Sequence, residues 1–303
     1  MYELIIIGGG PAGMTAAVYA ARKKIDTLLL AREIGGQVTA TSGIENYMGY
    51  QYIEGNELMD KFEKQLTQFP IKQQIGEEVI RMARVDRGWE VIAKSGASYQ
   101  SRAVIIATGK NPRRLAVPGE KELTGRGVSY CAVCDGPLFT GENVAVIGGG
   151  NSALEAIDDL LKIATRVYSI TDLGYTGDAV LVDRIKGHPN LVECHRCQVL
   201  EIRGDIRVQT MMIKDGQRGE NRTLAVGGVF IEIGLVPNSD PVKGLARLNT
   251  QGEIEINCNC ETSTQGLLAA GDVTNIPEKQ IIIAAGEGAK SALVAHRYIQ
   301  RAQ

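Results

Sequence analysis

Residues 5–13 read Ile5-Ile6-Ile7-Gly8-Gly9-Gly10-Pro11-Ala12-Gly13, and residues 144–150 read Val144-Ala145-Val146-Ile147-Gly148-Gly149-Gly150. Each stretch is an apolar run that ends in a glycine-rich turn and leads into an alanine-containing segment. A strand, a glycine turn, a helix and a second strand within about 30 residues make up the dinucleotide-binding βαβ unit. One such turn is a weak signal, but two with the right flanking segments predict two dinucleotide-binding units.

The segments around the two turns predict an α/β fold of two Rossmann-like dinucleotide-binding domains, each a three-layer sheet sandwich. Helices are expected at 15–23 and 152–163, and strands should follow them at 27–30 and 166–170. A final helix is expected at 286–300, where apolar residues recur near helical spacing.

The second domain is expected to be inserted into the first. A buried strand at 104–109 is followed by a segment rich in proline and glycine, which predicts a linker. We therefore assign residues 1–115 and 243–303 to the first domain. Residues 116–242 are assigned to the second domain, which carries a closely spaced cysteine pair.

The composition is that of an ordinary globular chain, with 303 residues, 44% hydrophobic residues and a formal net charge of −2. This charge gives no reason to expect nucleic acid or an anionic membrane as a partner. No apolar run approaches the ~18 residues of a membrane span. The N-terminus lacks the basic and apolar regions of a signal peptide. These features predict a cytoplasmic protein with no nucleic-acid or membrane partner.

The cysteine pair Cys131 and Cys134 is separated by two residues and followed by Asp135. This spacing lets a small ring open and close by thiol–disulfide exchange. Asp135 is the nearest candidate to move a proton to or from a thiol. If a helix opens at Asp135, its dipole would also favour a thiolate near its N-terminus. The alternatives are half of a zinc site or two buried thiols.

Cys194 and Cys197 form a second closely spaced pair. They fall in a segment that predicts one continuous strand, 191–202, in which side chains at i and i+3 face opposite ways. This orientation argues against a second redox pair. It also argues against a zinc site, which needs about four ligands. No metal site is therefore expected.

The first glycine turn has residues suited to a pyrophosphate. Gly8 permits the tight turn, Gly10 lets the backbone approach the phosphates, and Gly13 lets the helix pack closely. The helix N-terminus adds amide donors and a partial positive charge. Glu33, which lies 23 residues after Gly10, is placed to accept hydrogen bonds from a ribose. Residues 35–37 follow as a second loop of close approach.

The second glycine turn carries a signal for the electron donor. Asp172 lies 22 residues after Gly150, at the expected end of the second strand of that unit. A carboxylate there suits the free 2′-hydroxyl of NADH and repels the 2′-phosphate of NADPH. No arginine lies within residues 169–175. The sequence therefore predicts a preference for NADH, with NADPH less favoured.

A series of short motifs is spread along the chain: Gly8–Gly13, Gly35–Gln37, Ile44–Tyr47, Ala107–Gly109, Gly125–Cys131, Cys134–Gly136 and Ala270–Val273. With these motifs in this order, the chain resembles one family of flavoproteins, the low-molecular-weight thioredoxin reductases. The resemblance extends along nearly its full length.

The resemblance implies FAD in the first domain, a pyridine nucleotide in the second and a homodimer. It places Asp272 at the ribityl or phosphate side of the flavin, with Asn46 and Gln280 near its ring system. It also implies that Cys134 is the thiol nearer the flavin and that Cys131 attacks the substrate disulfide. The residues expected to bind FAD are Gly8, Gly10, Pro11, Ala12, Gly13, Glu33, Gly36, Gln37, Asn46, Ala107, Thr108, Gly109, Gly271, Asp272, Lys279, Gln280 and Ile281. Those expected to bind the pyridine nucleotide are Gly148, Gly150, Asn151, Ser152, Ala153 and Asp172.

Two departures from the family bear on the donor and the partner. The family's basic motif for the 2′-phosphate of NADPH is replaced here by Thr171-Asp172-Leu173. Residues 135–139, 148–152 and 279–284 are more similar to the flavoprotein component of alkyl hydroperoxide reductase. That relative uses NADH and carries an additional N-terminal thioredoxin-like module. This chain shows no such module, so we expect a separate thioredoxin- or glutaredoxin-like protein as its disulfide substrate.

These observations predict a thioredoxin-disulfide reductase that passes electrons from NADH through FAD to the Cys131–Cys134 disulfide. Because nicotinamide and the disulfide must use the flavin in turn, a rotation between the domains is expected. Its hinges are predicted near residues 112–119 and 238–243. The alternatives are a reductase of a peroxiredoxin system, a ferredoxin-fed reductase and a flavin-binding redox sensor. The intact second glycine turn favours a pyridine nucleotide over ferredoxin, and a sensor would need an output module.

Overall fold

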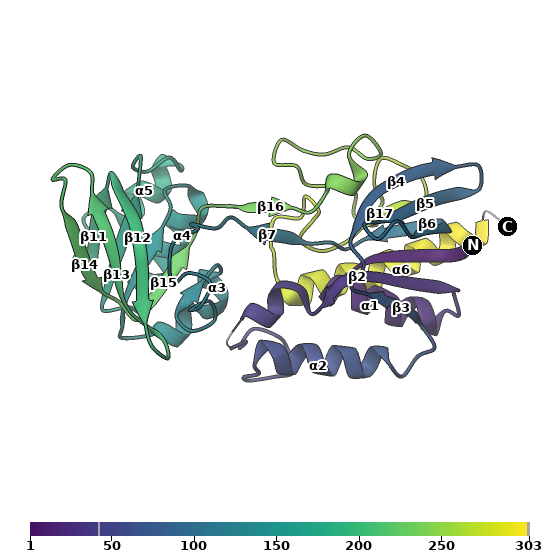
Figure 1. The fold of residues 1–303 in the computed structure, drawn as a ribbon, viewed down its shortest axis with the longest axis horizontal. Coiled ribbons are helices and arrows are strands. Elements are labelled where there is room, and N and C mark those ends of the chain that lie inside the picture. The colour runs from purple at the N-terminus through teal and green to yellow at the C-terminus, as the bar shows by residue number, and fades with distance from the viewer. Residues whose placement is uncertain (42, 302–303) are drawn as a thin grey trace.

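The computed structural model describes residues 1–41 and 43–301 and forms two halves, each built on a largely parallel sheet (Figure 1). Two short antiparallel strands, β7 (Lys110–Pro112) and β16 (Leu235–Pro237), run between the halves. The chain crosses to the second half after β7 and returns along β16. The second half is therefore inserted into the first, as the sequence predicts.

The sheet of the first half has the order β3-β2-β1-β6-β5-β4, and β17 also pairs with β6. Apolar side chains alternate along the central strand: Leu4 and Ile6 pack toward the helices, and Ile5 and Ile7 pack on the opposite face. Both faces of the strand are thus buried, as is usual in a parallel sheet. The strands are β1 (Tyr2–Gly9), β2 (Thr27–Ile34), β3 (Lys72–Ile75), β4 (Val79–Val85), β5 (Gly88–Ala93), β6 (Ser98–Ile106) and β17 (Leu267–Ala269).

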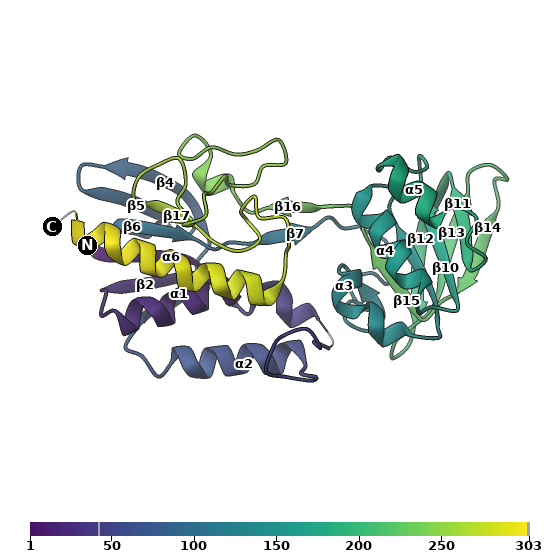
Figure 2. The same ribbon diagram turned by 180° about the vertical axis from the view of Figure 1, so that it is seen from behind.

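Three helices cover one face of this sheet, as Figures 1 and 2 show: α1 (Pro11–Arg22), α2 (Gly55–Leu66) and α6 (Ile281–Arg301). A Cβ atom at Gly288 would lie 2.1 Å from the carbonyl oxygen of Ala12, so α1 and α6 pack backbone against backbone. The last helix therefore begins at Ile281 rather than at residue 286, because its glycines serve packing and do not end the helix. Short 3-10 helices occur at Gly36–Ala40 and Asp240–Val242. Within the described residues, no helix combines the length and the apolar character needed to cross a membrane.

The second half has a parallel sheet of order β11-β10-β9-β15-β8 and a separate antiparallel sheet of order β12-β13-β14. One core lies between the two sheets, and another lies between the parallel sheet and its helices. This is the expected three-layer arrangement. The elements are β8 (Val128–Ser129), α3 (Ala132–Asp135), the 3-10 helix Gly136–Phe139, β9 (Asn143–Ile147), α4 (Asn151–Leu161), β10 (Arg166–Thr171), α5 (Ala179–Ile185), β11 (Leu191–His195), β12 (Cys197–Gly204), β13 (Val208–Asp215), β14 (Asn221–Ala225) and β15 (Gly228–Ile231).

The continuous strand expected at 191–202 is wrong. Arg196 has a φ of 56°, which breaks the segment into β11, in the parallel sheet, and β12, in the antiparallel sheet. Cys194 and Cys197 consequently point into the same core instead of facing opposite ways, and each is 3% exposed. Both are free thiols, and burial raises the pKa of each, so neither is placed for exchange with a partner.

The segments next to the two connecting strands pack against different halves. Leu115 and Val117 pack against the core of the second half. On the return, Val242 lies in the core of the first half, and Asn238 donates from Nδ2 to the carbonyl oxygen of Thr108 at 2.8 Å. The segment 238–243 is thus held by the first half. We accordingly propose that the returning hinge lies at 234–237, a few residues before the expected position.

Candidate functional site

A pocket of about 830 Å³ opens at the carboxyl ends of the strands of the first sheet and is also lined by the second half. This volume falls in the range of small-molecule and cofactor sites. The predicted residues that line it are Gly8, Gly10, Pro11, Ala12, Glu33, Gly36, Gln37, Ala107, Thr108, Gly109, Cys131, Cys134, Asp135, Gly271, Asp272, Lys279, Gln280 and Ile281.

Two residues expected at FAD do not line this pocket. Gly13 packs under the turn, where a Cβ atom would lie 1.9 Å from the carbonyl oxygen of Gly8. Asn46 is exposed next to the pocket and donates from Nδ2 to Gln280 Oε1 at 3.2 Å. Gly13 therefore supports the turn, and Asn46 positions an amide that does line the pocket.

The two glycine turns have nearly the same backbone. Gly8 and Gly148 have φ values of 124° and 137°, and a Cβ atom on either would strike a neighbouring carbonyl oxygen at 2.1 or 2.2 Å. Gly10 and Gly150 are the N-cap residues of α1 and α4, and a Cβ atom on either would meet nothing within 4 Å. Each turn is thus an open cradle at a helix N-terminus, which is the geometry that receives a pyrophosphate.

Charged residues form part of the wall of the first pocket. Lys110 and Lys279 both contact the carboxylate of Glu253, with Lys279 Nζ 3.2 Å from Oε1, and Lys110 and Glu253 are buried. Burial raises the pKa of the nearby Asp272 carboxyl, and the two lysines partly offset this rise. Glu287 of α6 accepts the backbone N–H of Gly271 at 2.8 Å and so holds the turn that carries Asp272.

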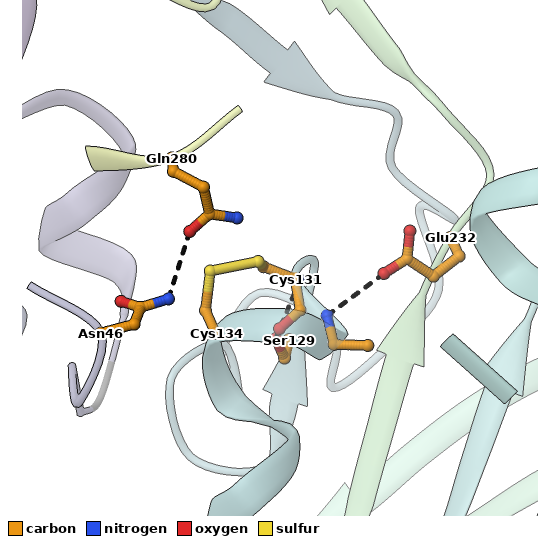
Figure 3. Close-up of a disulfide and its surroundings, with 7 residues drawn as sticks. Asn46, Ser129, Cys131, Cys134, Glu232 and Gln280 are labelled. Carbon is orange, nitrogen blue, oxygen red and sulfur yellow. Dashed lines mark hydrogen bonds between the residues drawn. A yellow bond between two sulfur atoms is a disulfide. The ribbon is translucent and has the colours of Figure 1, made fainter. Parts of the chain in front are cut away.

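Cys131 and Cys134 form a disulfide that faces the Asn46–Gln280 pair across the two halves (Figure 3). Both cysteines are half-buried, and both line the pocket together with the residues expected at FAD. Ser129 holds the segment from below, because its Oγ accepts the N–H of Cys131 at 3.1 Å. The arrangement brings a reducible disulfide to a site suited to a flavin.

The helix beside the disulfide begins earlier than the sequence suggests. The expectation that it opens at Asp135 is wrong, because α3 starts at Ala132 with Cys131 as its N-cap, and Asp135 is its last residue. The helix has four residues, so its dipole is small.

Asp135 is 5% exposed, and its Oδ1 atom has no hydrogen-bond partner among the described residues. Burial raises the pKa of Asp135 to about 6, and a hydrogen bond with Ser129 offsets part of the rise. A carboxyl with a pKa near 6 can be protonated or ionised close to neutral pH. Asp135 therefore has the proton affinity required of a general acid or base beside a dithiol.

The residues of the second half that are expected to bind the pyridine nucleotide lie away from this pocket. None of Gly148, Gly150, Asn151, Ser152, Ala153 and Asp172 lines it. Asn151 and Asp178 exchange two hydrogen bonds, of 2.9 and 2.8 Å, across the turn. Asp172 is exposed at the end of β10, and Thr171 beside it lies 3.1 Å from His195 Nδ1. In this arrangement the disulfide, and not the second turn, meets the first pocket.

Several buried groups near the disulfide belong to no recognised motif. The hydroxyl of Tyr130 donates to Glu120 at 2.7 Å, and Glu120 accepts the N–H groups of Leu115 and Ala116 in the connecting segment. Glu232, which follows β15, accepts the N–H of Ala132 at 3.3 Å (Figure 3). The sequence offers one signal for Glu232: it is an acidic residue directly after the buried strand Gly228–Ile231.

The chain matches the family of pyridine nucleotide-disulphide oxidoreductases over residues 2–297. It is 43% identical over 305 aligned residues to the F component of alkyl hydroperoxide reductase from Pseudomonas putida. That alignment covers 99% of this chain and 58% of the relative, so the chain spans little more than half of the relative's length.

Solved structures show the same fold. Thioredoxin reductase from Streptococcus pyogenes MGAS5005 matches with a TM-score of 0.94 at 37% identity, over 99% of each chain. Lactococcus lactis thioredoxin reductase, described as in the FR conformation, matches with a TM-score of 0.68 at 35% identity, over 99% of this chain and 100% of that one. Identity and coverage are nearly equal in the two matches, whereas the TM-scores differ. This chain has the arrangement of the streptococcal structure.

Proposed function

Because the chain belongs to the pyridine nucleotide-disulphide oxidoreductase family, we propose that it is a flavin-dependent thioredoxin-disulfide reductase that takes its electrons from NADH. The observation that carries this proposal is the Cys131–Cys134 disulfide in the wall of the pocket lined by the residues expected at FAD. The second candidate is a reductase of a peroxiredoxin system. It is favoured by the 43% identity to the F component of alkyl hydroperoxide reductase.

The family implies FAD, and the first pocket fits it. The adenosine and pyrophosphate of FAD would fit the open cradle at Gly10, the carboxylate of Glu33 and the loop at Gly36. The flavin end would lie near Asp272 and Gln280. When bound, FAD supplies two-electron transfer between a pyridine nucleotide and a disulfide. The protein's own part is to hold the Cys131–Cys134 segment against this pocket and to provide a proton at Asp135 when a thiol leaves.

A protein partner suits the surface around the dithiol. Val133, between the two cysteines, is 60% exposed, and Leu138 is 40% exposed on the 3-10 helix that follows α3. Exposed apolar residues beside a reactive group favour docking of another protein. A thioredoxin- or glutaredoxin-like domain that presents its own disulfide would bury both side chains.

The proposed function is tested by anaerobic titration of the purified protein with NADH, followed by addition of thioredoxin or of the thioredoxin-like module of a peroxiredoxin system. We expect NADH to bleach the flavin absorbance and reduced thioredoxin to appear. Reduction of the peroxiredoxin module alone would support the second candidate. If neither NADH nor NADPH reduces the flavin, the result would point to ferredoxin as the electron donor.

The proposed cycle requires the second half to turn about its connecting strands. In the present arrangement the disulfide meets the first pocket while the second glycine turn does not line it. A rotation about residues 111–114 and 234–237 would exchange the two, and the buried Lys110–Glu253 pair would stay with the first half. The difference between the two TM-scores is in keeping with this motion.

Asp172 is expected to select NADH. Its exposed carboxylate at the end of β10 would bind a ribose hydroxyl and repel a 2′-phosphate. Because like charges in contact cost several kcal/mol, kcat/KM for NADH should exceed that for NADPH by at least about 100-fold. Asp172→Ser should reduce this ratio to about 10 or less, chiefly by raising the efficiency with NADPH. Asp183→Asn, at an exposed position on α5, is the matched control. Comparable efficiencies for the two nucleotides in the unaltered protein would contradict the assignment.

We also propose that the protein is a homodimer joined through its first half. Met48 and Tyr52 are 86% and 53% exposed, and Tyr50 and Ile282 are 37% and 42% exposed. Several large apolar side chains exposed to water on one half favour an interface there. Sedimentation equilibrium should give twice the chain mass, and Met48→Asp should shift the protein toward the monomer. A monomer at all concentrations would refute the proposal.

A further inference from the structure

Glu232 touches both the second glycine turn and the disulfide helix. Its backbone N–H donates to the carbonyl oxygen of Ile147 at 2.8 Å, and its own carbonyl oxygen lies 2.2 Å from the place of a Cβ atom on Gly148. On its other side, Oε1 accepts the N–H of Ala132, the residue after Cys131 (Figure 3). One residue therefore connects the nucleotide cradle with the dithiol segment.

The carboxylate of Glu232 has an unused oxygen. Its Oε2 atom makes no hydrogen bond to any residue in 1–41 or 43–301, and no lysine, arginine or histidine of these ranges pairs with it. The side chain is half-buried, so this oxygen is not sealed in the core. The pKa of Glu232 is raised to about 7, chiefly by burial; the hydrogen bond from Ala132 offsets part of the rise, and the nearby Glu155 on α4 adds to it. A partly desolvated acceptor of this kind gains from a hydrogen-bond donor.

The sheet order places this oxygen at one end of the nucleotide site. A dinucleotide lies across the carboxyl ends of the strands, with its pyrophosphate at the glycine turn. Strand β9, which carries the turn, lies between β10 and β15. Asp172 at the end of β10 marks the adenosine side, so the other half of the nucleotide extends over the end of β15, where Glu232 begins.

We propose that Glu232 is a specificity-determining residue for the pyridine nucleotide, and that its free Oε2 accepts a hydrogen bond from the –NH2 group of the nicotinamide carboxamide. The Ala132 N–H fixes the carboxylate through Oε1 and leaves Oε2 directed to the ligand. This inference rests on the proposed function in that it requires a pyridine nucleotide at the second turn. It adds the residue that recognises the nicotinamide end and places that end beside the disulfide segment.

The test compares three ligands that differ at this end. NAD⁺ has the carboxamide, 3-acetylpyridine adenine dinucleotide has a methyl group in place of the –NH2, and ADP-ribose lacks the ring. Dissociation constants are measured by titration calorimetry on the oxidised, FAD-loaded protein, with no turnover. At pH 8, above the pKa of Glu232 of about 7, the unaltered protein should bind NAD⁺ about 10-fold or more tightly than the acetyl analogue, because a hydrogen bond to a charged group is lost.

In Glu232→Ala, NAD⁺ and the acetyl analogue should bind equally, and the affinity for ADP-ribose should stay at that of the unaltered protein. Glu232→Gln keeps the size of the side chain, but its single oxygen is taken by the Ala132 N–H, so an –NH2 donor faces the carboxamide and the discrimination should be lost as in Glu232→Ala. Glu122→Ala, at an exposed position in the same half, is the control.

Two results would overturn the inference and leave the proposed function standing. The first is a Glu232→Ala variant that still discriminates between NAD⁺ and the acetyl analogue. The second is a loss of affinity shared equally by all three ligands, which would show damage to the cradle and not a contact with the carboxamide. Failure of every ligand to bind the unaltered protein would instead overturn the nucleotide site itself, and the proposed function with it.

Discussion

Replacing either Cys131 or Cys134 with serine is expected to lower the turnover of a thioredoxin-like substrate by about 1,000-fold or more, because one thiol cannot form the Cys131–Cys134 disulfide. Reduction of the flavin by NADH should persist in both variants, since neither cysteine belongs to the second glycine turn. The measurement is a pair of experiments: steady-state reduction of thioredoxin, and anaerobic stopped-flow reduction of the flavin. If reduction of the flavin by NADH were also lost, the variants would have a structural defect, and their lower turnover would not show a redox role for the cysteines.

The same two variants separate the roles of the cysteines. If Cys131 attacks the substrate, Cys134→Ser should accumulate a mixed disulfide with a thioredoxin-like protein, whereas Cys131→Ser should not. Cys258→Ser removes an exposed free thiol elsewhere in the chain and is the matched control. Unaltered turnover in a Cys131→Ser or Cys134→Ser protein would refute the dithiol mechanism.

Features held by local geometry were predictable from the sequence. A Cβ atom at Gly8 or Gly148 would strike a carbonyl oxygen at 2.1 or 2.2 Å, so the turn needs glycine and the motif shows it. The alternating burial along β1 follows from its apolar run. The insertion of one half into the other follows from the buried strand at 104–109 and the proline- and glycine-rich segment after it. The resemblance to thioredoxin reductases rested on the same short motifs, and the family match and the streptococcal structure confirm it.

Features made by distant contacts left no local signal. Lys110 and Glu253 are 143 residues apart in the chain, and Ala132 and Glu232 are 100 residues apart. Arg196 has a positive φ although it is not glycine, so no turn residue marks the break, and the sequence of 191–202 predicts one strand. The contact of Asn238 with Thr108, on which our proposed position of the returning hinge rests, likewise spans 130 residues.

Two carboxyl side chains of different burial flank the disulfide helix α3: Glu232 is half-buried and Asp135 is buried. Glu232 contacts its first amide and keeps an oxygen free, whereas Asp135 ends the helix with an oxygen that is buried and unpartnered among the described residues. Both have pKa values raised by burial, to about 7 and about 6. The reaction proposed here needs a proton at a departing thiol, and Asp135 is the carboxyl that lines the pocket with both cysteines. Asp135 is therefore the residue on which the pH dependence of the dithiol step should rest.

Asp135→Asn is expected to slow dithiol exchange with the substrate by about 100-fold or more, the usual contribution of a positioned acid or base. In the unaltered protein, the single-turnover rate of this step should show an inflection near pH 6, and the variant should lose it, because its amide does not titrate. Flavin reduction by NADH should be unaffected. The profile is measured by rapid mixing of the reduced protein with a disulfide substrate between pH 5 and 8. An inflection near pH 6 that persists in Asp135→Asn would assign the proton to another group.

Asp135→Asn is expected to slow the dithiol step but to stabilise the fold near neutral pH. The sign of the effect on stability follows from the direction of the pKa shift of Asp135. The pKa of Asp135 rises from 3.8 to about 6 on folding because of burial, so the folded protein binds more protons than the unfolded chain between these values. The free-energy cost of ionising this buried carboxyl is therefore absent below about pH 4 and destabilises the fold progressively as the pH rises to about 6. A shift of this size corresponds to roughly 3 kcal/mol.

Urea unfolding of the oxidised protein at pH 4.5 and 7.5 should thus show a smaller loss of stability with pH in Asp135→Asn than in the unaltered protein. Asp60→Asn, at an exposed position on α2, is the matched control and should leave the loss unchanged. An identical pH dependence in all three proteins would show that Asp135 is not a buried anion above pH 6. A variant that is slower in exchange yet more stable at pH 7.5 would show that the fold retains a destabilising carboxyl because the dithiol requires its proton.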